Sequence, residues 1–483
     1  MAQTKTKRPY KPKAYGHSYQ KPKPNRPGGV FIDFQALPAS LDEDEYKQLI
    51  EGLPKPKGRS KPRSVEHADL LATKLNEMHE VAEKEGVPNF VGRNRRDAVW
   101  EITTQRLNSR VPVMAEGVLD EHGKGHYFLR THSRDYIPAE EDVFVPQELR
   151  ERYGLLQGMS VRGPLRAVRE GEKYLCLHDV EQIDGADPEE LNGRTPFKEL
   201  VPLYPNERII LEGAADNPLE MRIVDLITPL GRGQRGLIVA PPRTGKTVLL
   251  KMLAQSVMAN APDAHLIILL VDERPEEVTD FERSVTGKNV EVVSSTFDEP
   301  ASRHIQVAER VIERAKNMVE AGADVVILLD SITRLARSCN IEAPSNGKLL
   351  SGGLEATALQ FPKRFFGAAR NMEDGGSLTI LGTALIETGS KMDEVIFEEF
   401  KGTGNMEIVL DRRISDRRIF PAIDINRSGT RKEELLFTPE EIERIWMLRK
   451  VLNELDPVEA MEMLIQKMRK TSVNAEFLMT IGS

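Results

Sequence analysis

The sequence predicts a multidomain protein of α+β and α/β class, and three patterns carry this prediction. Apolar residues recur at helical spacing between about residues 64 and 110. Five short runs of β-forming residues follow within residues 111–186, separated by Gly, Pro, Asp or Asn. Between about residues 221 and 430, apolar strands alternate with helix-like segments, which is typical of a parallel sheet covered by helices.

Composition narrows the class of protein. The chain has 483 residues, of which 40% are hydrophobic and 29% charged, as expected of a globular protein with several domains. The longest apolar runs, such as 266–271, are too short to cross a bilayer. The N-terminus is basic without an apolar core, so it is no secretory signal. The only cysteines, Cys176 and Cys339, cannot form a disulfide framework. We therefore expect a cytoplasmic protein that does not enter a membrane.

The N-terminal segment differs in charge from the rest of the chain. The net charge is −8, yet residues 1–30 carry eight Lys or Arg and no acid. Residues 54–63 repeat this Lys- and Pro-rich composition. We therefore predict a disordered basic, Pro-rich arm and linker over 1–63. Such an arm adds salt-sensitive contacts to phosphates, with a solubilising tail as the alternative.

A small helical subdomain is predicted over 64–110. One apolar stripe precedes a break at 86–88, and a second helix spans 96–107. The apolar residues assigned to these helices are Leu70, Leu71, Leu75, Met78, Val81, Val99, Trp100 and Ile102.

Residues 111–186 predict a five-stranded OB-fold β-barrel. The strand-like runs are 111–119, 125–130, 142–145, 160–163 and 174–177. The second run places aromatic residues beside Arg130, and Phe144 and Tyr174 lie on other runs. Aromatic faces next to a basic residue can stack the bases of single-stranded nucleic acid. Aromatics in a small barrel equally serve as its core.

A connector over 187–220 leads into an α/β domain over 221–483. Its buried strands are predicted at 236–240, 266–271, 325–329 and 378–382. Amphipathic helices are expected over 439–469.

The segment Ala240-Pro-Pro-Arg-Thr-Gly-Lys-Thr247 lies between a predicted strand and a predicted helix. This is the layout of a phosphate-binding loop, in which backbone N–H groups face the phosphates. Lys246 then reaches the β- and γ-phosphates, and the Thr247 hydroxyl binds Mg²⁺. The usual pattern begins with Gly, whereas this loop begins with Ala240.

Two carboxylates are candidates for the chemistry at that loop. Asp330 ends an apolar run 84 residues after Lys246, where a carboxylate can hold the water shell of Mg²⁺. Glu273 follows another apolar run and can polarise an attacking water. Taken singly, Asp330 can also be a structural cap and Glu273 a surface carboxylate.

Basic residues and Gly-rich loops occupy the later part of this domain. Arginines cluster in 411–420 and 426–431, where one can stabilise charge on a γ-phosphate or simply pair at an interface. Gly and single lysines in 344–353, 387–392 and 401–404 suit contact with a polyanion, or ordinary mobile loops.

Several long runs resemble the Rho family of transcription termination factors. These runs are Leu328–Arg337, Lys363–Arg370, Glu387–Phe400, Gly402–Met406 and Phe420–Glu434. The resemblance spans roughly residues 75–480, and in this family the phosphate loop begins Ala-Pro-Pro. It implies a RecA-like ATPase domain in a homohexameric ring, an RNA-dependent ATPase and 5′-to-3′ RNA helicase. Such a ring uses ATP and Mg²⁺ to move along single-stranded RNA and release it from RNA polymerase, with elongation factors as further partners.

The resemblance also implies roles for individual residues. Those implied in catalysis are Lys246, Thr247, Glu273, Asp330, Arg418 and Arg431, the last as a finger from the neighbouring subunit. Those implied in metal binding are Thr247 and Asp330. Those implied in ATP contact are Gly231, Arg232, Gly233, Gln234, Arg235, Gly236, Arg243, Thr244, Gly245, Lys246, Thr247, Val248, Arg274 and Phe420, which stacks on adenine. Those implied in primary RNA binding are Gly125, His126, Tyr127, Phe128, Leu129, Arg130, Asp142, Val143, Phe144, Glu172, Lys173 and Tyr174. Those implied in gripping RNA in the pore are Lys348, Leu349, Leu350, Ser351, Gly352, Gly353 and Lys391.

Two departures from the family pattern affect these expectations. His126 stands where the family usually has an aromatic, which leaves the base preference open. Strand alternation predicts that Tyr127 points to the other face and does not replace it. Residues 1–63 lie outside the resemblance, and we expect them to add RNA affinity. The alternatives are a rotary-ATPase-type catalytic subunit and an RNA-binding or chaperone protein whose ATP site is vestigial.

Overall fold

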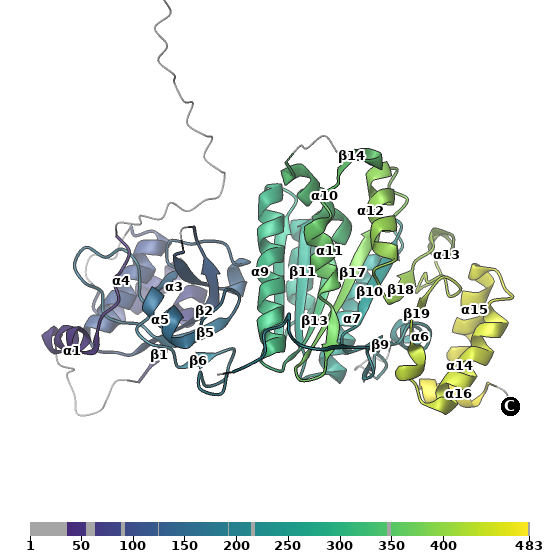
Figure 1. Ribbon diagram of the computed structural model, residues 1–483, viewed down its shortest axis with the longest axis horizontal. Coiled ribbons are helices and arrows are strands. Elements are labelled where there is room, and N and C mark those ends of the chain that lie inside the picture. Colours follow the sequence, from purple (N-terminus) through teal and green to yellow (C-terminus); the bar gives the residue numbers. More distant parts are fainter. Residues whose placement is uncertain are drawn as a thin grey trace, which may run out of the picture.

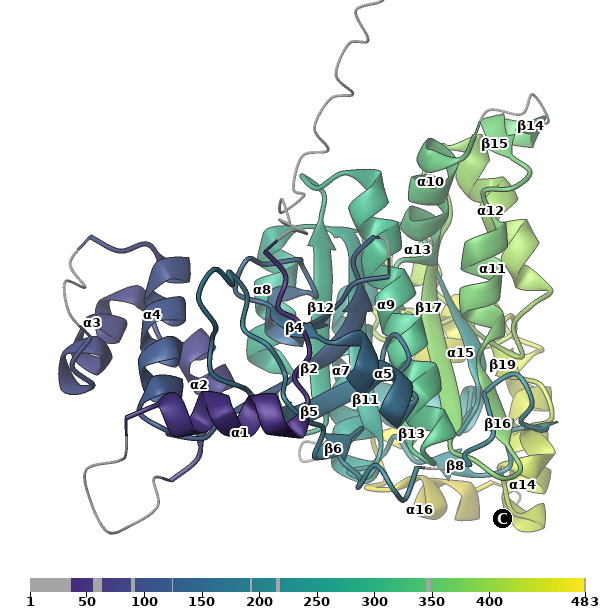
Figure 2. The same cartoon turned by 60° about the vertical axis from the view of Figure 1, so that its left-hand side comes forward.

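The computed structural model describes residues 36–54, 63–87, 92–123, 125–191, 193–213, 218–344 and 349–481. A small helical unit and a barrel form one half of the molecule, and a large α/β domain with C-terminal helices forms the other (Figure 1). Figure 2 shows the helical unit extending away from the large sheet. In this view the barrel strands lie in front of the large sheet. No helix in the described part of the chain is long and apolar enough to span a membrane.

The segment expected to be a disordered arm contains a helix, so that expectation is wrong for its later part. Helix α1 spans Glu43–Gly52 and begins with a capping box formed by Asp42 and Glu45. Leu49 and Leu53 pack against the barrel core, which stabilises a helix this short. Residues 1–35 and 55–62 lie outside the described residues.

The helical subdomain follows as three short helices. The predicted apolar stripe is divided between two of them, because Thr73 and Lys74 are extended. Leu70, Met78 and Ile102 are buried together in its core. The helices are α2 (His67–Ala72), α3 (Leu75–Lys84) and α4 (Arg95–Asn108).

The barrel sheet has the strand order β4-β3-β2-β5-β6, with β1 added beside β2. The fifth expected run, 174–177, forms only single bridges, from Phe144 to Cys176 and from Leu165 to Leu177. These bridges link β4 through residues 174–177 to the residue that follows β5, and so close the barrel. The strands are β1 (Val65–Glu66), β2 (Val113–Glu121), β3 (Tyr127–Arg130), β4 (Val143–Val145), β5 (Ser160–Pro164) and β6 (Gln182–Ile183), and helix α5 (Gln147–Tyr153) follows β4.

The large domain is built on a nine-stranded sheet, in which seven strands follow the order β12-β11-β13-β17-β10-β18-β19. The other two strands branch from β17, because β16 pairs with β17 and β7 pairs with β16. The pairs from β12 to β18 are parallel, as the alternation of strands and helices predicts. The strands are β7 (Pro202–Leu203), β10 (Arg235–Ala240), β11 (His265–Glu273), β12 (Val290–Thr296), β13 (Asp324–Asp330), β16 (Arg370–Met372), β17 (Ser377–Leu385), β18 (Met406–Val409) and β19 (Gly429–Thr430). Two further pairs are β8 (Arg208–Ile209) with β9 (Leu230–Gly231), and β14 (Leu349–Leu350) with β15 (Leu354–Glu355).

Helices cover both faces of this sheet. Leu237 and Val239 of β10 pack on one face, and Ile238 and Ala240 pack in a separate core on the other, as the period of two requires. The helices are α6 (Leu219–Ile227), α7 (Lys246–Asn260), α8 (Pro275–Ser284), α9 (Ala301–Glu320), α10 (Ile332–Glu342), α11 (Gln360–Gly367), α12 (Lys391–Lys401), α13 (Arg412–Asp416), α14 (Pro439–Leu452), α15 (Pro457–Met468) and α16 (Asn474–Met479).

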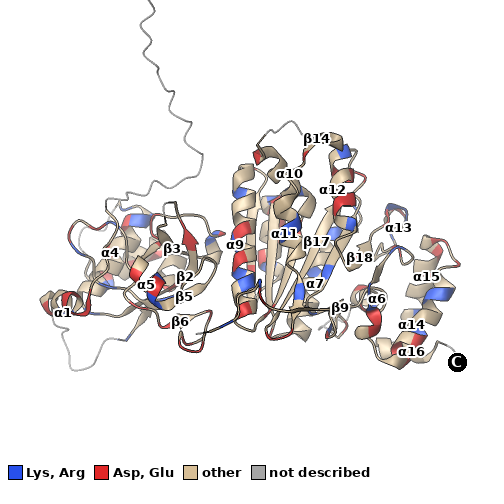
Figure 3. Cartoon of the chain, in the orientation of Figure 1, with Lys and Arg blue, Asp and Glu red and all other residues tan. Residues whose placement is uncertain are grey.

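Helix α9 joins the barrel to the large domain. It contains many charged residues and lies between the barrel and the large sheet (Figure 3). Arg310 of α9 donates two hydrogen bonds of 2.8 Å to Asp120 of β2, and both residues are buried. Arg314 pairs with Glu291 at 2.7 Å, and the same carboxylate accepts a 2.6 Å hydrogen bond from Tyr136. The buried Arg310–Asp120 ion pair and the Tyr136 hydrogen bond to Glu291 therefore fix the N-terminal half against the large domain.

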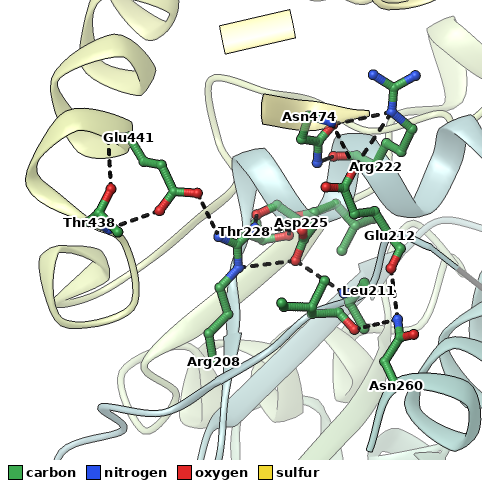
Figure 4. A network of polar contacts seen from close by, with 12 residues as sticks. Arg208, Leu211, Glu212, Arg222, Asp225, Thr228, Asn260, Thr438, Glu441 and Asn474 are labelled. Atoms are coloured by element: carbon green, nitrogen blue, oxygen red, sulfur yellow. Dashed lines mark hydrogen bonds and ion pairs between the residues drawn. The ribbon is translucent and has the colours of Figure 1, made fainter. Parts of the chain in front are cut away.

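A second polar network holds the C-terminal helices against α6 (Figure 4). Arg208 pairs with Asp225 of α6 at 2.5 Å and with Glu441 of α14 at 3.6 Å. Arg222 of α6 donates to Asn474, which begins α16. Burial raises the pKa of Asp225, and Arg208 opposes that shift. The C-terminal helices are thus an integral part of the large domain.

Candidate functional site

The loop between β10 and α7 has the geometry expected of a phosphate-binding loop. Strand β10 ends at Ala240, and α7 begins at Lys246 directly after Gly245. Gly245 has φ 87° and Arg243 has φ 67°, so both adopt the left-handed conformation. The Thr244 hydroxyl donates a 2.8 Å hydrogen bond to the Pro241 carbonyl. This compact turn ends at a helix N-terminus, where free N–H groups and the helix dipole favour an anion.

The structure brings together two predicted phosphate-site residues that lie 84 residues apart in sequence. Lys246 Nζ lies 2.5 Å from both carboxylate oxygens of Asp330. Asp330 ends β13, is 1% exposed and accepts a 2.7 Å hydrogen bond from Thr383. Strands β10 and β13 flank β17, so the carboxyl ends of these strands meet at one edge of the sheet.

Glu273 lies at the same edge, at the end of β11, and is 3% exposed. Its pKa is raised to about 7 by burial and then by the charge of Asp330, against the opposing effects of Lys246 and Arg334. Arg334 Nη2 lies 3.3 Å from Glu273 Oε2, but that oxygen has no hydrogen-bond partner. A buried carboxylate with a pKa near 7 and an oxygen that accepts no hydrogen bond suits a general base.

Three polar residues of the site were not predicted from sequence. They are Arg334 beside Glu273, Thr383 beside Asp330, and Glu277, which accepts a 3.2 Å hydrogen bond from Thr247. Helical spacing could have found Arg334, which lies one turn after the helix cap Ser331 that follows Asp330. Glu277 lies in the first turn of α8, which begins two residues after Glu273.

An apolar cavity of about 460 Å³ lies beside the phosphate loop. Phe420, Pro421, Val248 and Met252 line it, together with Gly245. Phe420 is 44% exposed, so its ring face is open. An aromatic face in an apolar pocket next to a phosphate site suits the stacking of a purine ring.

Residues Gly231–Gly236, expected to contact ATP, do not lie at the phosphate loop of their own subunit. They lie at the amino end of β10, whereas the phosphate loop follows its carboxyl end. Six residues of strand separate the ends by roughly 20 Å. The side chains have structural partners there: Arg232 pairs with Asp324, and Gln234 donates to Asn405 at 2.6 Å.

The arginines have two different locations. Arg418 is exposed, has φ 61° and lies two residues before Phe420, beside the apolar cavity. Arg431 is exposed and lies at the other end of the sheet, where its N–H donates to Asn405. Arg235 lies near it, and burial together with the charges of Arg370 and Arg431 lowers the pKa of Arg235. Arg431 is therefore far from the phosphate loop of its own subunit.

Arg274, the other arginine expected to contact ATP, is exposed at the start of α8.

The two loops expected to grip RNA lie together at one end of the large domain, next to β14 and α12 (Figure 1). A Cβ on Gly352, which has φ 75°, would lie 2.8 Å from the N atom of Met392 and 2.9 Å from the carbonyl carbon of Lys391. Lys391 begins α12 and is exposed. Lys348 lies outside the described residues. Residues Leu349–Leu350 form β14, and Ser351–Gly353 form a single turn.

An ion pair connects these loops to the phosphate site. Helix α10 starts two residues after Asp330, and its Arg337 donates two hydrogen bonds, of 2.7 and 2.5 Å, to Asp393 of α12. Asp393 is 1% exposed. A bidentate pair to a buried carboxylate is geometrically specific, so α10 and α12 are held in a fixed relation.

On the barrel, β3 separates its side chains as alternation predicts. Tyr127 packs against the barrel core, and Arg150 lies 4.5 Å from its ring centroid. His126 lies on the opposite face, with its ring 6.5 Å from that of Phe144. Tyr127 therefore does not replace the aromatic that is absent at His126.

The three aromatic residues of the expected primary RNA site form one cluster with few exposed atoms. Phe128 contacts Phe144 and Tyr174 edge to face, with ring centroids 5.6 and 5.9 Å away. All three are buried with Cys176, and Leu37 packs against them. Leu129 and Val143 point into the barrel core, while Gly125 is exposed at the turn before β3.

Arg130 does not present its guanidinium for RNA contact, contrary to the expectation from sequence. Its side chain is 0% exposed and pairs with Asp120 and Asp142. Burial lowers the pKa of Arg130 to about 10, against the effect of Asp120. Glu172 is likewise engaged, because it pairs with Arg166 at 2.6 Å.

Family models match two parts of the chain. A model described as Rho termination factor, RNA-binding domain, matches residues 115–189. A model described as ATP synthase alpha/beta family, nucleotide-binding domain, matches residues 220–430. A solved type III secretion system ATPase from pathogenic bacteria covers 61% of this chain and 90% of its own, with TM-score 0.50 and 23% identity. That likeness supports the α/β fold of the large domain.

Curated relatives cover most of the chain. A protein named transcription termination factor Rho from Aquifex aeolicus is 51% identical over 427 residues, which is 88% of this chain and 98% of the relative. Proteins of the same name are 50% identical over 85% of this chain in Pseudomonas aeruginosa and 48% identical over 93% in Rhodopirellula baltica. These two matches cover 97% of the Pseudomonas aeruginosa protein and 88% of the Rhodopirellula baltica protein. The barrel, the ATPase domain and their order along the chain agree with these matches, and the chain belongs to the transcription termination factor Rho family.

Proposed function

We propose that this protein is an RNA-dependent ATPase that moves 5′ to 3′ along single-stranded RNA and releases it from RNA polymerase. One observation carries the proposal: a barrel matched by the Rho RNA-binding model and a complete phosphate site occur in one chain. A rotary-ATPase-type subunit accounts for the large domain but not for that barrel. We assign the helical subdomain to 64–110, the barrel to 111–186, the connector to 187–220 and the ATPase domain to 221–483.

At the ATP site, we assign the phosphates to the N–H groups at the start of α7 and to Lys246. The Asp330 carboxylate accepts a 2.5 Å hydrogen bond from Lys246 Nζ, which keeps the amine beside the loop. From this position the Lys246 side chain can turn to bind a phosphate. The free oxygen of Glu273 accepts the proton of the attacking water. Adenine stacks on Phe420 in the apolar cavity. Arg243, Thr244 and Val248 complete the nucleotide contacts, and Arg274 and Arg418 approach from the exposed side.

The residues at the loop fit Mg²⁺, which prefers a few carboxylate or hydroxyl ligands together with phosphate oxygens and water. Thr247 and Asp330 offer that donor set. Among the described residues, no group of three or more His, Cys, Asp or Glu could bind a metal without such additional ligands. When bound with ATP, Mg²⁺ neutralises charge on the phosphates.

The location of Arg431 supports an active site shared between subunits. It lies at the amino end of β10, too far from its own phosphate loop, and is exposed beside Arg235. In a homohexameric ring this positively charged end faces the nucleotide of the neighbouring subunit, and Arg431 stabilises charge on its γ-phosphate. Gly231–Gly236 contribute to the same surface.

Coupling between ATP and RNA follows the path from Asp330 through α10 to α12. The Arg337–Asp393 pair transmits a displacement of α10 to Lys391. Lys348, Lys391 and the backbone around Gly352 bind the RNA phosphates in the pore. Movement of α12 during hydrolysis then shifts the bound RNA.

The test is ATP turnover with and without poly(C), in the parent and in Lys246→Ala. We expect poly(C) to stimulate the parent strongly and Lys246→Ala to be inactive while it still binds RNA. If poly(C) leaves the rate of ATP turnover unchanged, the result favours a rotary-ATPase-type catalytic subunit. RNA binding with no turnover in the parent indicates a vestigial ATP site.

A further inference from the structure

The most unexpected part of the molecule is the segment of residues 36–53, here called the strap. It comprises an extended stretch over 36–42 and helix α1. The strap crosses the barrel and meets the face to which we assign RNA binding. Its helical end is firmly attached, because Leu49 and Leu53 pack against the barrel core. Arg110 also donates a 2.7 Å hydrogen bond to the Leu53 carbonyl.

The extended end of the strap contacts the aromatic cluster itself. Leu37 packs against the cluster formed by Phe128, Phe144, Tyr174 and Cys176. Each of these three aromatic residues is at most 7% exposed, whereas a base can stack only on an open ring face. The side chain of Leu37 thus lies at the rings on which a base would stack.

Backbone groups of the strap also contact residues of the expected RNA site. The N–H of Lys173 donates to the Ala36 carbonyl at 3.3 Å. Arg166 donates to the Ala39 carbonyl at 2.9 Å while pairing with Glu172. The Lys173 N–H and the Arg166 guanidinium can donate these hydrogens to RNA only after the strap leaves, because each donor hydrogen serves one acceptor well.

The charge and ring chemistry of α1 resemble those of a nucleic acid strand. The strap contains five acidic residues and one basic residue. Glu45 pairs with Arg169 of the barrel at 3.7 Å. The Tyr46 ring stacks on His178, with centroids 3.5 Å apart and planes at 20°. These contacts hold α1 on the barrel, whereas the extended end places an apolar group and acceptor carbonyls where single-stranded RNA would bind.

We propose that the strap is an intramolecular competitor for RNA on the barrel. Residues 36–42 cover the aromatic cluster, and RNA binds there only when they lift away while α1 stays attached. This rests on the proposed RNA-binding role of that face. Because the strap is tethered, its effective concentration is high, and it sets a threshold that only RNA of sufficient affinity crosses.

Leu37→Ser in the full-length protein tests the competition. Gln48→Ser, on the exposed side of α1, is the matched control with the same new side chain. The measurement is fluorescence anisotropy of a labelled oligocytidylate without ATP. We expect Leu37→Ser to bind about five-fold more tightly than the parent, the effect of losing the half-buried apolar contact, about 1 kcal/mol. Gln48→Ser should match the parent. Equal or weaker binding by Leu37→Ser overturns the proposal.

Amide hydrogen exchange on the parent gives an independent readout. Added oligocytidylate should speed exchange over residues 36–42 if RNA displaces the strap. Unchanged or slower exchange there, with RNA bound, overturns competition and makes the strap part of the RNA platform. If neither parent nor variants bind the oligonucleotide, the RNA-binding role of the barrel fails as well. RNA binding by the parent with no gain in Leu37→Ser rejects the strap alone.

Discussion

The buried contact between Arg310 and Asp120 predicts a large loss of stability when the arginine is replaced. Arg310 is 4% exposed and Asp120 is 2% exposed, and two 2.8 Å hydrogen bonds join them. Arg310→Met preserves much of the volume but leaves the carboxylate buried with fewer partners. Breaking a buried pair in this way costs about 3–5 kcal/mol. Asp120 keeps contacts with Arg130 at 3.2 Å and Gln157 at 3.3 Å, so we expect about 3 kcal/mol, at the lower end of that range.

The two tryptophans make this loss measurable. Trp100 lies in α4 of the N-terminal half, and Trp446 lies in α14. In a Trp446→Phe background, fluorescence reports on the half that contains the barrel. With a urea dependence of about 2 kcal/mol per molar, the midpoint should fall by about 1.5 M in Arg310→Met.

The control is Lys316→Met on the same helix, which removes a 2.8 Å intrahelical pair with the half-exposed Glu313. A surface pair of this kind is worth about 0.5 kcal/mol or less. If Arg310→Met shifts the midpoint no further than Lys316→Met does, the Asp120 contact does not hold the barrel against α9.

Three further predictions concern the ATP site and its link to the pore. Because the pKa of Glu273 is raised to about 7 and a base must be ionised, kcat/KM for ATP should rise as the pH increases through about 7. Glu273→Gln should lose at least about 100-fold in turnover and with it this pH dependence, whereas a flat profile in the parent contradicts the role. Phe420→Ala should raise KM for ATP about ten-fold with kcat nearly unchanged; a fall in kcat alone argues against adenine stacking. Arg337→Ala should reduce RNA-stimulated turnover more than basal turnover, and an equal loss in both would place the Arg337–Asp393 pair outside the coupling.

Sequence reasoning located the parts of the ATP site that depend on strand ends. An apolar run followed by a carboxylate or by the phosphate loop fixes which end of a parallel strand carries the group. That is why Lys246, Glu273 and Asp330 were expected at one edge and lie there. Period-two alternation also predicted the opposite directions of His126 and Tyr127.

Three features required the tertiary structure. Alternation places Arg130 on the face of Phe128 but does not reveal that Asp120 and Asp142 bury its guanidinium. The resemblance assigns Gly231–Gly236 to ATP contact, but only the structure shows that they lie at the opposite end of β10 from the phosphate loop. Helix α1 lies between two Lys- and Pro-rich stretches, and that composition obscured its capping box.

Strand displacement tests the central claim, that ATP hydrolysis at Lys246 and Asp330 moves the protein along RNA. The substrate is a DNA oligonucleotide annealed near the 3′ end of a cytidine-rich RNA, and the measurement is its release with ATP. We predict release that requires hydrolysable ATP, fails in Lys246→Ala, and fails when the single-stranded segment lies 3′ of the duplex. RNA-stimulated ATP turnover without release of the annealed strand would contradict the account.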